Sequence, residues 1–248
     1  MELIKVLAPM AGITDGKFAL KLIPYGFDTV SIGGYNTDDE TIAAGEEILQ
    51  RGRNEFHIEK RNLKETIENE INIIKNQYPQ IKVSANLRAT TPEPIIDISK
   101  IKNLDIVEVN CHCRQEELLA IGCGQGMLTN SDHLKGFIKK IAKKIKNNQK
   151  LSVKIRANVP KIDTLNIAKL IEESGADYLH IDAMKPGKAY ADLEIIKKIS
   201  NETDIFIIGN NSIIDIQTAR NMLNAGASGI SIGRAAINGK LDFNLSQL

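Results

Sequence analysis

The sequence predicts an α/β fold, a single (β/α)8 TIM barrel that occupies residues 1–248. Two observations support this prediction. First, short runs rich in β-branched residues alternate with longer amphipathic segments along the whole chain, a pattern typical of parallel strands covered by helices on both faces. Second, eight such units in 248 residues fit a closed barrel better than an open doubly wound sheet. No linker, low-complexity tract or longer repeat divides the series, so we expect one domain.

Taken in order, each predicted strand is a short apolar run, and each predicted helix repeats its apolar residues every three or four positions. The predicted strands are residues 5–8, 28–32, 82–87, 105–109, 151–156, 178–182, 205–209 and 229–233. The clearest predicted helices are residues 63–76, 133–147, 164–174, 193–199 and 214–225. Residues 33–53, between the second strand and the first of these helices, are polar and contain glycine, so we predict a long loop that covers a site.

The composition is that of a soluble globular protein, with 42% hydrophobic and 25% charged residues. The net charge of +1 creates no overall field that would attract DNA or a membrane, and no apolar run reaches the length of a membrane span. The N-terminus lacks the features of a signal peptide, and the odd number of cysteines, three, indicates free thiols. We therefore expect a cytoplasmic protein with no DNA partner and no membrane partner.

Residues 135–150 are locally basic, with lysines at helical spacing. A solvated helix face explains this pattern best, and a patch that contacts RNA is the alternative.

Polar residues share one parity near the ends of four neighbouring predicted strands. Successive side chains of a strand point to opposite faces, so residues of one parity share a face. Buried charge is costly unless it is paired or used, which favours an active site at the C-terminal mouth of the barrel. A salt-bridged polar plug, for instance Glu108 with Lys154, is the alternative. The residues predicted to line the mouth are Asn86, Asn110, Lys154, Arg156, His180 and Asp182.

The last two strands end in glycine-containing loops, at Gly209-Asn210 and at Gly233-Arg234. Glycine lets backbone amides approach an anion, a following helix N-terminus adds its positive end, and the loops after strands seven and eight are the usual phosphate site of this fold. Arg234 could hold a phosphate with two parallel hydrogen bonds. The sequence therefore predicts a phosphate site at these loops.

Two of the three cysteines, Cys111 and Cys113, follow the predicted strand 105–109 directly, and Cys123 lies in a glycine-spaced run. Their Cys-x-Cys spacing differs from the Cys-x2-4-Cys spacing of structural zinc sites, so we predict no metal site. We interpret Cys111 and Cys123 as small packing residues. Cys113 is the candidate reactive thiol.

At this point the chain resembles the dihydrouridine synthase family, within the wider group of FMN-binding barrels that includes dihydroorotate dehydrogenases. Residues 7–15 resemble the opening A-P-M-A-G-x-T-D, residues 110–113 resemble N-x-G-C-P with a matching spacing to Leu128, and residues 152–156 resemble V-K-x-R. Gly209-Asn210 and Gly233-Arg234 resemble the two phosphate-binding signatures of the family. The resemblance runs from residue 7 to about residue 236.

The resemblance implies that reduced FMN gives a hydride to the C5=C6 bond of a pyrimidine, that Cys113 delivers a proton to C5, and that NAD(P)H supplies the electrons. It implies that Lys154 stabilises negative charge on the N1/O2 edge of the flavin, and that Asn110, Arg156 and His180 face the substrate. The residues that it assigns to FMN are Ala8, Pro9, Met10, Asn86, Lys154, Asp182, Gly209, Asn210, Gly233 and Arg234.

Four departures concern mainly the substrate side. Arg114 replaces the proline after the cysteine, Asp182 stands where the family has H-x-R-T, and Asn211-Ser212 replace a Gly-Asp pair. The chain also ends soon after Ala236, where the synthases continue into a helical domain that grips tRNA.

The implied function is reduction of uridine to dihydrouridine, with tRNA as the expected partner. The alternatives are a dihydroorotate dehydrogenase-like enzyme acting on a free small molecule, a flavin-free barrel enzyme that binds a sugar phosphate, and a metal-binding or regulatory protein.

Overall fold

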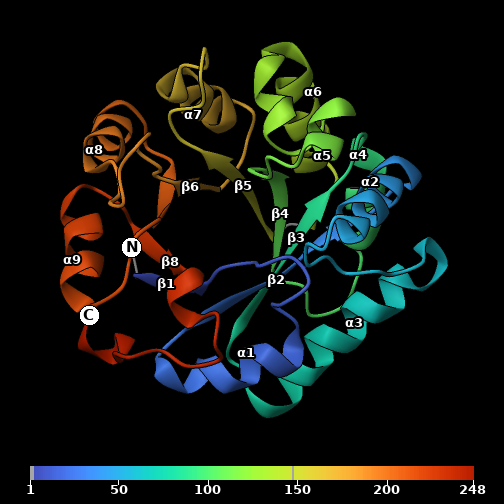
Figure 1. Cartoon of the computed structure of the whole chain (residues 1–248), viewed down its shortest axis with the longest axis horizontal. Coiled ribbons are helices and arrows are strands. Elements are labelled where there is room, and N and C mark those ends of the chain that lie inside the picture. The colour runs from blue at the N-terminus through green and yellow to red at the C-terminus, as the bar shows by residue number, and fades with distance from the viewer. Residues whose placement is uncertain (1–2, 147) are drawn as a thin grey trace.

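Eight parallel strands, hydrogen-bonded in sequence order, close into a barrel that helices surround (Figure 1). The computed structural model describes residues 3–146 and 148–248. The predicted α/β barrel and its eight strands are confirmed, with boundaries shifted by a few residues at most strand ends. The strands are β1 (Ile4–Leu7), β2 (Thr29–Asn36), β3 (Lys82–Arg88), β4 (Ile106–Cys111), β5 (Lys150–Arg156), β6 (Tyr178–Asp182), β7 (Phe206–Asn210) and β8 (Gly229–Ile232).

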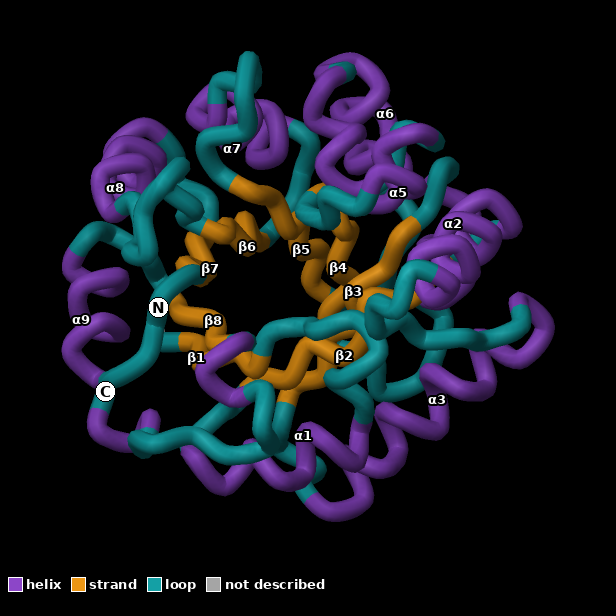
Figure 2. The backbone as a smooth tube through the Cα atoms, in the orientation of Figure 1, coloured by secondary structure: helices purple, strands orange, loops and turns teal. Residues whose placement is uncertain are grey.

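The helices form the outer layer, as the backbone trace shows (Figure 2). The α-helices are α1 (Gly16–Leu22), α2 (Asp39–Gln50), α3 (Lys60–Gln77), α4 (Pro92–Ile98), α5 (Glu116–Ala120), α6 (Ser131–Ala142), α7 (Thr164–Glu173), α8 (Leu193–Glu202) and α9 (Ile216–Asn224). Within the described residues, no helix has both the length and the apolar character needed to cross a membrane.

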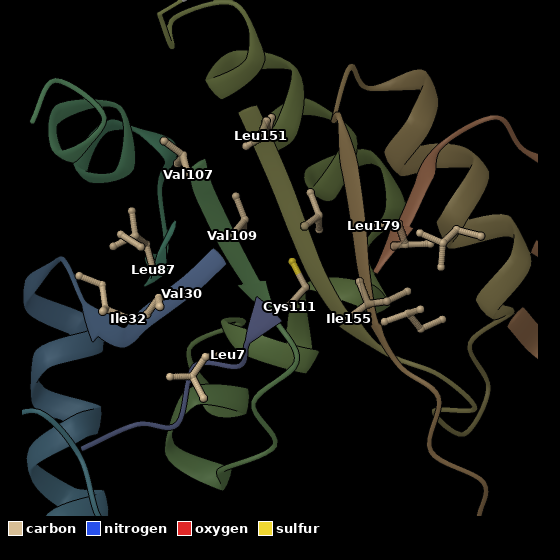
Figure 3. Close-up of a cluster of buried hydrophobic side chains, with 14 of the residues drawn as sticks. Leu7, Val30, Ile32, Leu87, Val107, Val109, Cys111, Leu151, Ile155 and Leu179 are labelled. Atoms are coloured by element: carbon tan, nitrogen blue, oxygen red, sulfur yellow. The ribbon is translucent and has the colours of Figure 1, made fainter. Parts of the chain in front are cut away.

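The outward-facing side chains of the strands pack beneath the helices and form the main core (Figure 3). On β4, Val107, Val109 and Cys111 all belong to this core, and each is at most 1% exposed. On α3, the buried residues Leu63, Ile67, Ile71 and Ile74 recur at helical spacing, so one face of the helix is apolar. Each such side chain contributes about 1.5–3 kcal/mol by leaving water. The packing role predicted for Cys111 is thus confirmed.

The inward-facing side chains change character along the barrel axis. At the N-terminal end, an apolar cluster plugs the interior, formed by Ile4, Val6, Ile106, Tyr178, Phe206 and Ile208. Two residues further along β4 and β6, on the same face, the side chains are polar: Glu108 follows Ile106, and His180 follows Tyr178. The interior therefore closes at the bottom with apolar groups and presents polar groups toward the C-terminal mouth.

The predicted covering loop over residues 33–53 is wrong. Strand β2 continues to Asn36, and α2 occupies Asp39–Gln50. Asp38 starts this helix with a capping box, in which its carboxylate accepts from the backbone N–H of Thr41 at 3.0 Å. Many of the polar residues that suggested a loop lie on the solvent face of α2, whose other face buries Thr41, Ala44, Gly45 and Ile48. Asn36, Thr37 and Asp38, just before the helix, are buried.

The helix predicted over 133–147 ends at Ala142, and residue 147 lies outside the described residues. Two of its lysines pair with neighbouring elements: Lys135 with Glu173 and Lys140 with Glu93. These exposed pairs fit the interpretation of the basic segment as a solvated helix face.

Candidate active site

A cavity of about 910 Å³ opens at the C-terminal end of the barrel strands. Its walls come from the loops after β1, β4, β6, β7 and β8 and from the end of β5. This is the end at which barrel enzymes place their active sites. Of the residues predicted from the sequence, those that line this cavity are Ala8, Pro9, Met10, Lys154, Arg156, Asp182, Asn210, Gly233 and Arg234.

Five predicted contact residues, Asn86, Asn110, Cys113, His180 and Gly209, do not line the cavity. Gly209 points the other way, because its parity on β7 is opposite to that of Asn210. A Cβ at Gly209 would lie 2.5 Å from the side chain of Met222 on α9, so this glycine permits the packing of helix against strand. Of the other four, His180 contacts the cavity residue Lys154, Asn110 accepts from the backbone of the cavity residue His112, and Cys113 follows His112 in the chain. Asn86 lies one step further away, where it accepts from Asn110.

Glu108 is the centre of a buried hydrogen-bond network in the barrel interior. One carboxylate oxygen accepts from Asn86 Nδ2 at 2.8 Å and from Ser31 Oγ at 3.2 Å. The other accepts from Ser152 Oγ at 2.9 Å and lies 2.7 Å from His180 Nδ1. Burial alone would raise the pKa of Glu108, but its neighbours overcome this effect and lower the pKa to about 2. Glu108 is therefore a fully satisfied buried carboxylate.

His180 connects this carboxylate to Lys154. Its Nε2 atom is 2.7 Å from Lys154 Nζ, and the side chain is fully buried. Burial and the charge of Lys154 lower the pKa of His180 to about 4, so the ring is neutral at pH 7. A neutral ring that donates from Nδ1 to Glu108 accepts from Lys154 at Nε2. The polar plug of Glu108 and Lys154 that was considered as an alternative is present, but His180 lies between the two residues. Lys154 also lines the cavity, so the plug and the candidate site share this residue.

Lys154 lies at the base of the cavity with unused hydrogen-bonding capacity. It is 3% exposed, and among the described residues its ammonium group has one hydrogen-bond partner, His180. Burial lowers its pKa to about 8, and Glu108 opposes this effect. An ammonium has three donors. The remaining donors suit an anionic or carbonyl group of a ligand in the cavity.

Asn110 holds the loop that carries the cavity residue His112 and its neighbour Cys113. Its Oδ1 atom accepts from the backbone N–H groups of His112 at 3.1 Å and Cys113 at 3.0 Å. Its Nδ2 atom donates to Asn86 Oδ1 at 2.7 Å. Gly124 packs against the carbonyl of Cys113, where a Cβ would come within 2.5 Å, and has a φ of +57°. The strand-end asparagine and this glycine together fix the position of Cys113.

Cys113 lies beside a buried guanidinium group. Arg88 Nη2 donates to Cys113 Sγ at 3.2 Å, and Arg88 Nη1 donates to Glu55 at 2.7 Å. Burial would raise the pKa of Cys113, but Arg88, His112 and Asn110 lower it to about 6. Burial raises the pKa of Cys111 and of Cys123 instead. All three cysteines are free, as predicted, and Cys113 is the one that ionises near neutral pH.

Asp182 organises the wall of the cavity opposite the β8 loop. Its carboxylate lies 2.8 Å from His112 Nε2 and 3.2 Å from Arg156 Nη2, and it accepts from Asn211 Nδ2 at 2.6 Å. Although burial acts against ionisation, these contacts hold the pKa of Asp182 far below its usual range. Arg156 Nε is buried and unpartnered among the residues that the structure describes. This wall therefore contains one unused donor, which is buried within it.

The loops after β7 and β8 lie where the phosphate site was predicted, and both line the cavity. Asn210 Nδ2 donates to the Ser231 carbonyl at 2.7 Å, which joins the ends of β7 and β8 just before these loops. The N-terminus of α9 is already capped, because the Asp215 carboxylate accepts from the Thr218 N–H at 2.7 Å. Asp215 therefore already occupies the helix terminus that was expected to attract a phosphate. Arg234 is the charged side chain that the β8 loop places at the cavity.

A family model described as dihydrouridine synthase (Dus) matches residues 6–239. This chain belongs to the dihydrouridine synthase family. An uncharacterized protein of Methanocaldococcus jannaschii is 38% identical, covering 96% of this chain and 91% of its own length. A probable tRNA-dihydrouridine synthase of Helicobacter pylori is 23% identical, covering 93% of this chain but 66% of its own length. The chain thus spans slightly less than two thirds of that synthase.

The structure is also similar to FabK from Thermotoga maritima, with a TM-score of 0.59 and 12% sequence identity. The similarity covers 94% of this chain and 58% of that one. At this identity it supports the barrel fold alone.

Four residues in or beside the candidate site were not among the site residues predicted from the sequence: Arg88, Glu55, Glu108 and His112. Arg88 continues the inward parity of Asn86 and is missed because the predicted strand stops at residue 87. His112 occupies the position of the glycine in N-x-G-C-P, a departure that the motif itself could have revealed. Glu55 gives no local signal, since only the folded chain brings it to Arg88.

Proposed function

We propose that this chain is an FMN-dependent oxidoreductase that reduces the C5=C6 bond of a uracil ring, with uridine in tRNA as substrate and NAD(P)H as electron source. The observation that carries this proposal is the buried ammonium of Lys154 with free donors at the base of a cavity, in a chain of the dihydrouridine synthase family. The cavity volume of about 910 Å³ suits a cofactor-sized ligand.

The residues around the cavity fit a flavin mononucleotide. Ala8, Pro9 and Met10 supply an apolar wall beside Gly233, at which a Cβ would lie 3.4 Å from Ala8 Cβ. Arg234 and the loop after β7 offer positive and polar groups for the phosphate. When bound there, FMN supplies the hydride.

Lys154 is proposed to stabilise the negative charge that accumulates on the reduced ring system. Its position is set from below, because His180 accepts one of its donors and Glu108 holds the His180 ring. His180 is thus proposed to position Lys154 and not to contact the substrate, which revises its predicted role. Lys154 remains mostly protonated at pH 7, since its pKa is about 8.

Cys113 is proposed to deliver the proton to C5 of the uracil. A proton donor must come within hydrogen-bond reach of the receiving atom. Cys113 lies between His112 and Arg114, which both line the cavity, but it does not line the cavity itself. The uracil ring must therefore bind next to His112 and Arg114 to come within reach of the Cys113 sulfur. Arg156, which lines the cavity, is proposed to hold a carbonyl oxygen of the ring.

The first test is the absorbance spectrum of the purified protein. We expect a yellow protein that releases FMN on denaturation. A colourless protein that cannot be reconstituted with FMN contradicts the proposal and favours a flavin-free phosphate-binding barrel.

The second test identifies the substrate by mass spectrometry of tRNA. We expect dihydrouridine to disappear from tRNA of a deletion strain that has no other synthase, and to return when the gene is restored. If dihydrouridine persists while the purified protein binds FMN, the chain is a flavin enzyme for a free pyrimidine, as in the dihydroorotate dehydrogenase alternative.

The third test concerns Lys154. We expect Lys154→Met to slow flavin reduction by about 10²-fold, because one stabilising donor at a site of developing charge is lost. Stopped-flow reduction by NAD(P)H measures this rate. Lys150→Met is a matched control, since Lys150 lies at the other end of β5 and pairs with Asp177 outside the cavity. Equal reduction rates for the two variants contradict the assigned role of Lys154.

A further inference from the structure

The charged side chains that line the cavity are mostly cationic, although the chain as a whole has a net charge of only +1. They comprise one carboxylate, Asp182, and five cations, Arg114, Lys154, Arg156, Lys188 and Arg234. Two of these cations have partners within the protein, since Lys154 contacts His180 at 2.7 Å and Arg156 contacts Asp182 at 3.2 Å. The proposed function assigns a third, Arg234, to the phosphate of FMN.

Arg114 and Lys188 remain available to a further ligand. Both side chains are exposed, and neither has a side-chain partner among residues 3–146 and 148–248. Arg114 comes from the loop after β4, and Lys188 comes from the loop after β6. These two loops meet where His112 Nε2 lies 2.8 Å from Asp182 Oδ2. Two unpaired cations thus lie on adjoining loops at the cavity.

The loop after β6 also presents an exposed aromatic ring at the cavity. Tyr190 is 55% exposed and lines the cavity, and so does Ile214, which is 65% exposed. In the described part of the chain, Ile237 is the one other exposed large hydrophobic side chain. Exposed apolar groups that gather at one place mark a binding surface. The rim of the cavity therefore combines unpaired cations with apolar contact area.

The position of the Tyr190 ring is supported by its neighbours. Ser212 Oγ donates to the Ala189 carbonyl at 2.8 Å, which joins this loop to the loop after β7. Lys185 Nζ lies 5.9 Å from the centre of the Tyr190 ring, within the range of a cation–π contact. Lys185 also pairs with Asp192 at 3.6 Å, so its charge is already matched. The ring is thus held in place before a ligand binds.

Proteins bind single-stranded nucleic acid with cations that follow the phosphates and with aromatic rings on which bases stack. A free pyrimidine has neither flanking phosphates nor a neighbouring base, so it would leave this rim unused. We propose that Arg114 and Lys188 bind phosphates beside the target uridine and that Tyr190 stacks on a neighbouring base. The inference rests on the proposed function and deepens it, because it assigns the selection of uridine within an RNA strand to this rim. Arg114 stands where the N-x-G-C-P motif has proline, so this contact is a feature of this chain.

The first measurement is the fluorescence anisotropy of a labelled single-stranded RNA with one uridine, bound to the flavin-loaded full chain at several salt concentrations. The double variant Arg114→Gln with Lys188→Gln should reduce the slope of log affinity against log salt by about 1.4, since each phosphate contact to a single strand contributes about 0.7. Lys82→Gln with Lys102→Gln is the matched control, because it removes two exposed lysines at the N-terminal end of β3 and before β4. Equal slopes for the two double variants overturn the proposal.

The same assay tests the aromatic ring. Tyr190→Ala should weaken RNA binding by about 5-fold or more, because one stacked base is lost. Tyr190→Phe should bind like the unaltered chain, because the ring is kept. If Tyr190→Phe weakens binding as much as Tyr190→Ala does, the ring does not act by stacking, and this part of the proposal is wrong.

The second measurement separates RNA from NAD(P)H, which also carries phosphates and a second base. The dependence of flavin reduction on NAD(P)H concentration gives the Kd of the dinucleotide, which should be the same for Arg114→Gln with Lys188→Gln as for the control. A higher Kd for NAD(P)H with unchanged RNA binding overturns the proposal and assigns the rim to the dinucleotide. If the unaltered chain binds the RNA but does not reduce its uridine, the proposed function fails, and the salt slopes still decide whether Arg114 and Lys188 contact the strand.

Discussion

Cys113→Ala should lower the rate of uracil reduction by about 10²–10⁴-fold while the protein still binds FMN. The rate falls because the proton for C5 is lost. Flavin binding survives because Cys113 is not part of the cavity lining. Single-turnover oxidation of the reduced flavin by the RNA substrate measures the rate, and the flavin absorbance measures binding on the same samples.

Cys111→Ala is the matched control for this prediction. Cys111 is two residues away, but it is fully buried among outward-facing apolar side chains, where its sulfur contacts Met127 at 3.7 Å (Figure 3). Its loss should affect packing and leave the oxidation rate near that of the unaltered chain. If Cys113→Ala and Cys111→Ala oxidise the flavin equally fast, Cys113 is not the proton donor.

Arg88→Met should reduce the free energy of unfolding by about 3–5 kcal/mol, the usual cost of breaking a buried ion pair on one side. The Arg88 and Glu55 side chains are 1% and 2% exposed, and Arg88 also donates to Asn36 at 3.1 Å. Removing the guanidinium leaves the Glu55 carboxylate buried without its charged partner. Urea unfolding followed by circular dichroism measures the change.

The double variant Arg88→Met with Glu55→Met separates this cause from simple loss of packing. Because it removes both charges, it should be more stable than Arg88→Met alone. Lys64→Met serves as the surface control, since the Lys64–Asp97 pair is exposed and its loss should barely move the transition. A double variant that is less stable than Arg88→Met would show that the Glu55 carboxylate stabilises the fold through a group other than Arg88, which contradicts the assigned ion pair.

The sequence alone determined the architecture and the general position of the site. Strand parity placed Lys154, Arg156 and Asp182 at one end of the barrel, and they do line one cavity there. The alternation of side chains between the two faces of a strand is a local property of the backbone, so the sequence predicts it without knowledge of the tertiary contacts. The same rule, applied more strictly, would have excluded Gly209 and included Arg88.

Only the tertiary structure decided what surrounds Cys113. Arg88, Glu55 and Asp182 come from three separate segments, and no spacing along the chain predicts that the first reaches the sulfur while the last orients His112. The ionisation of a buried thiol depends on charges a few ångströms away in space, which are unrelated to distance along the sequence. The chain order therefore identified the loop that carries Cys113, and the fold determined which charged groups surround its sulfur.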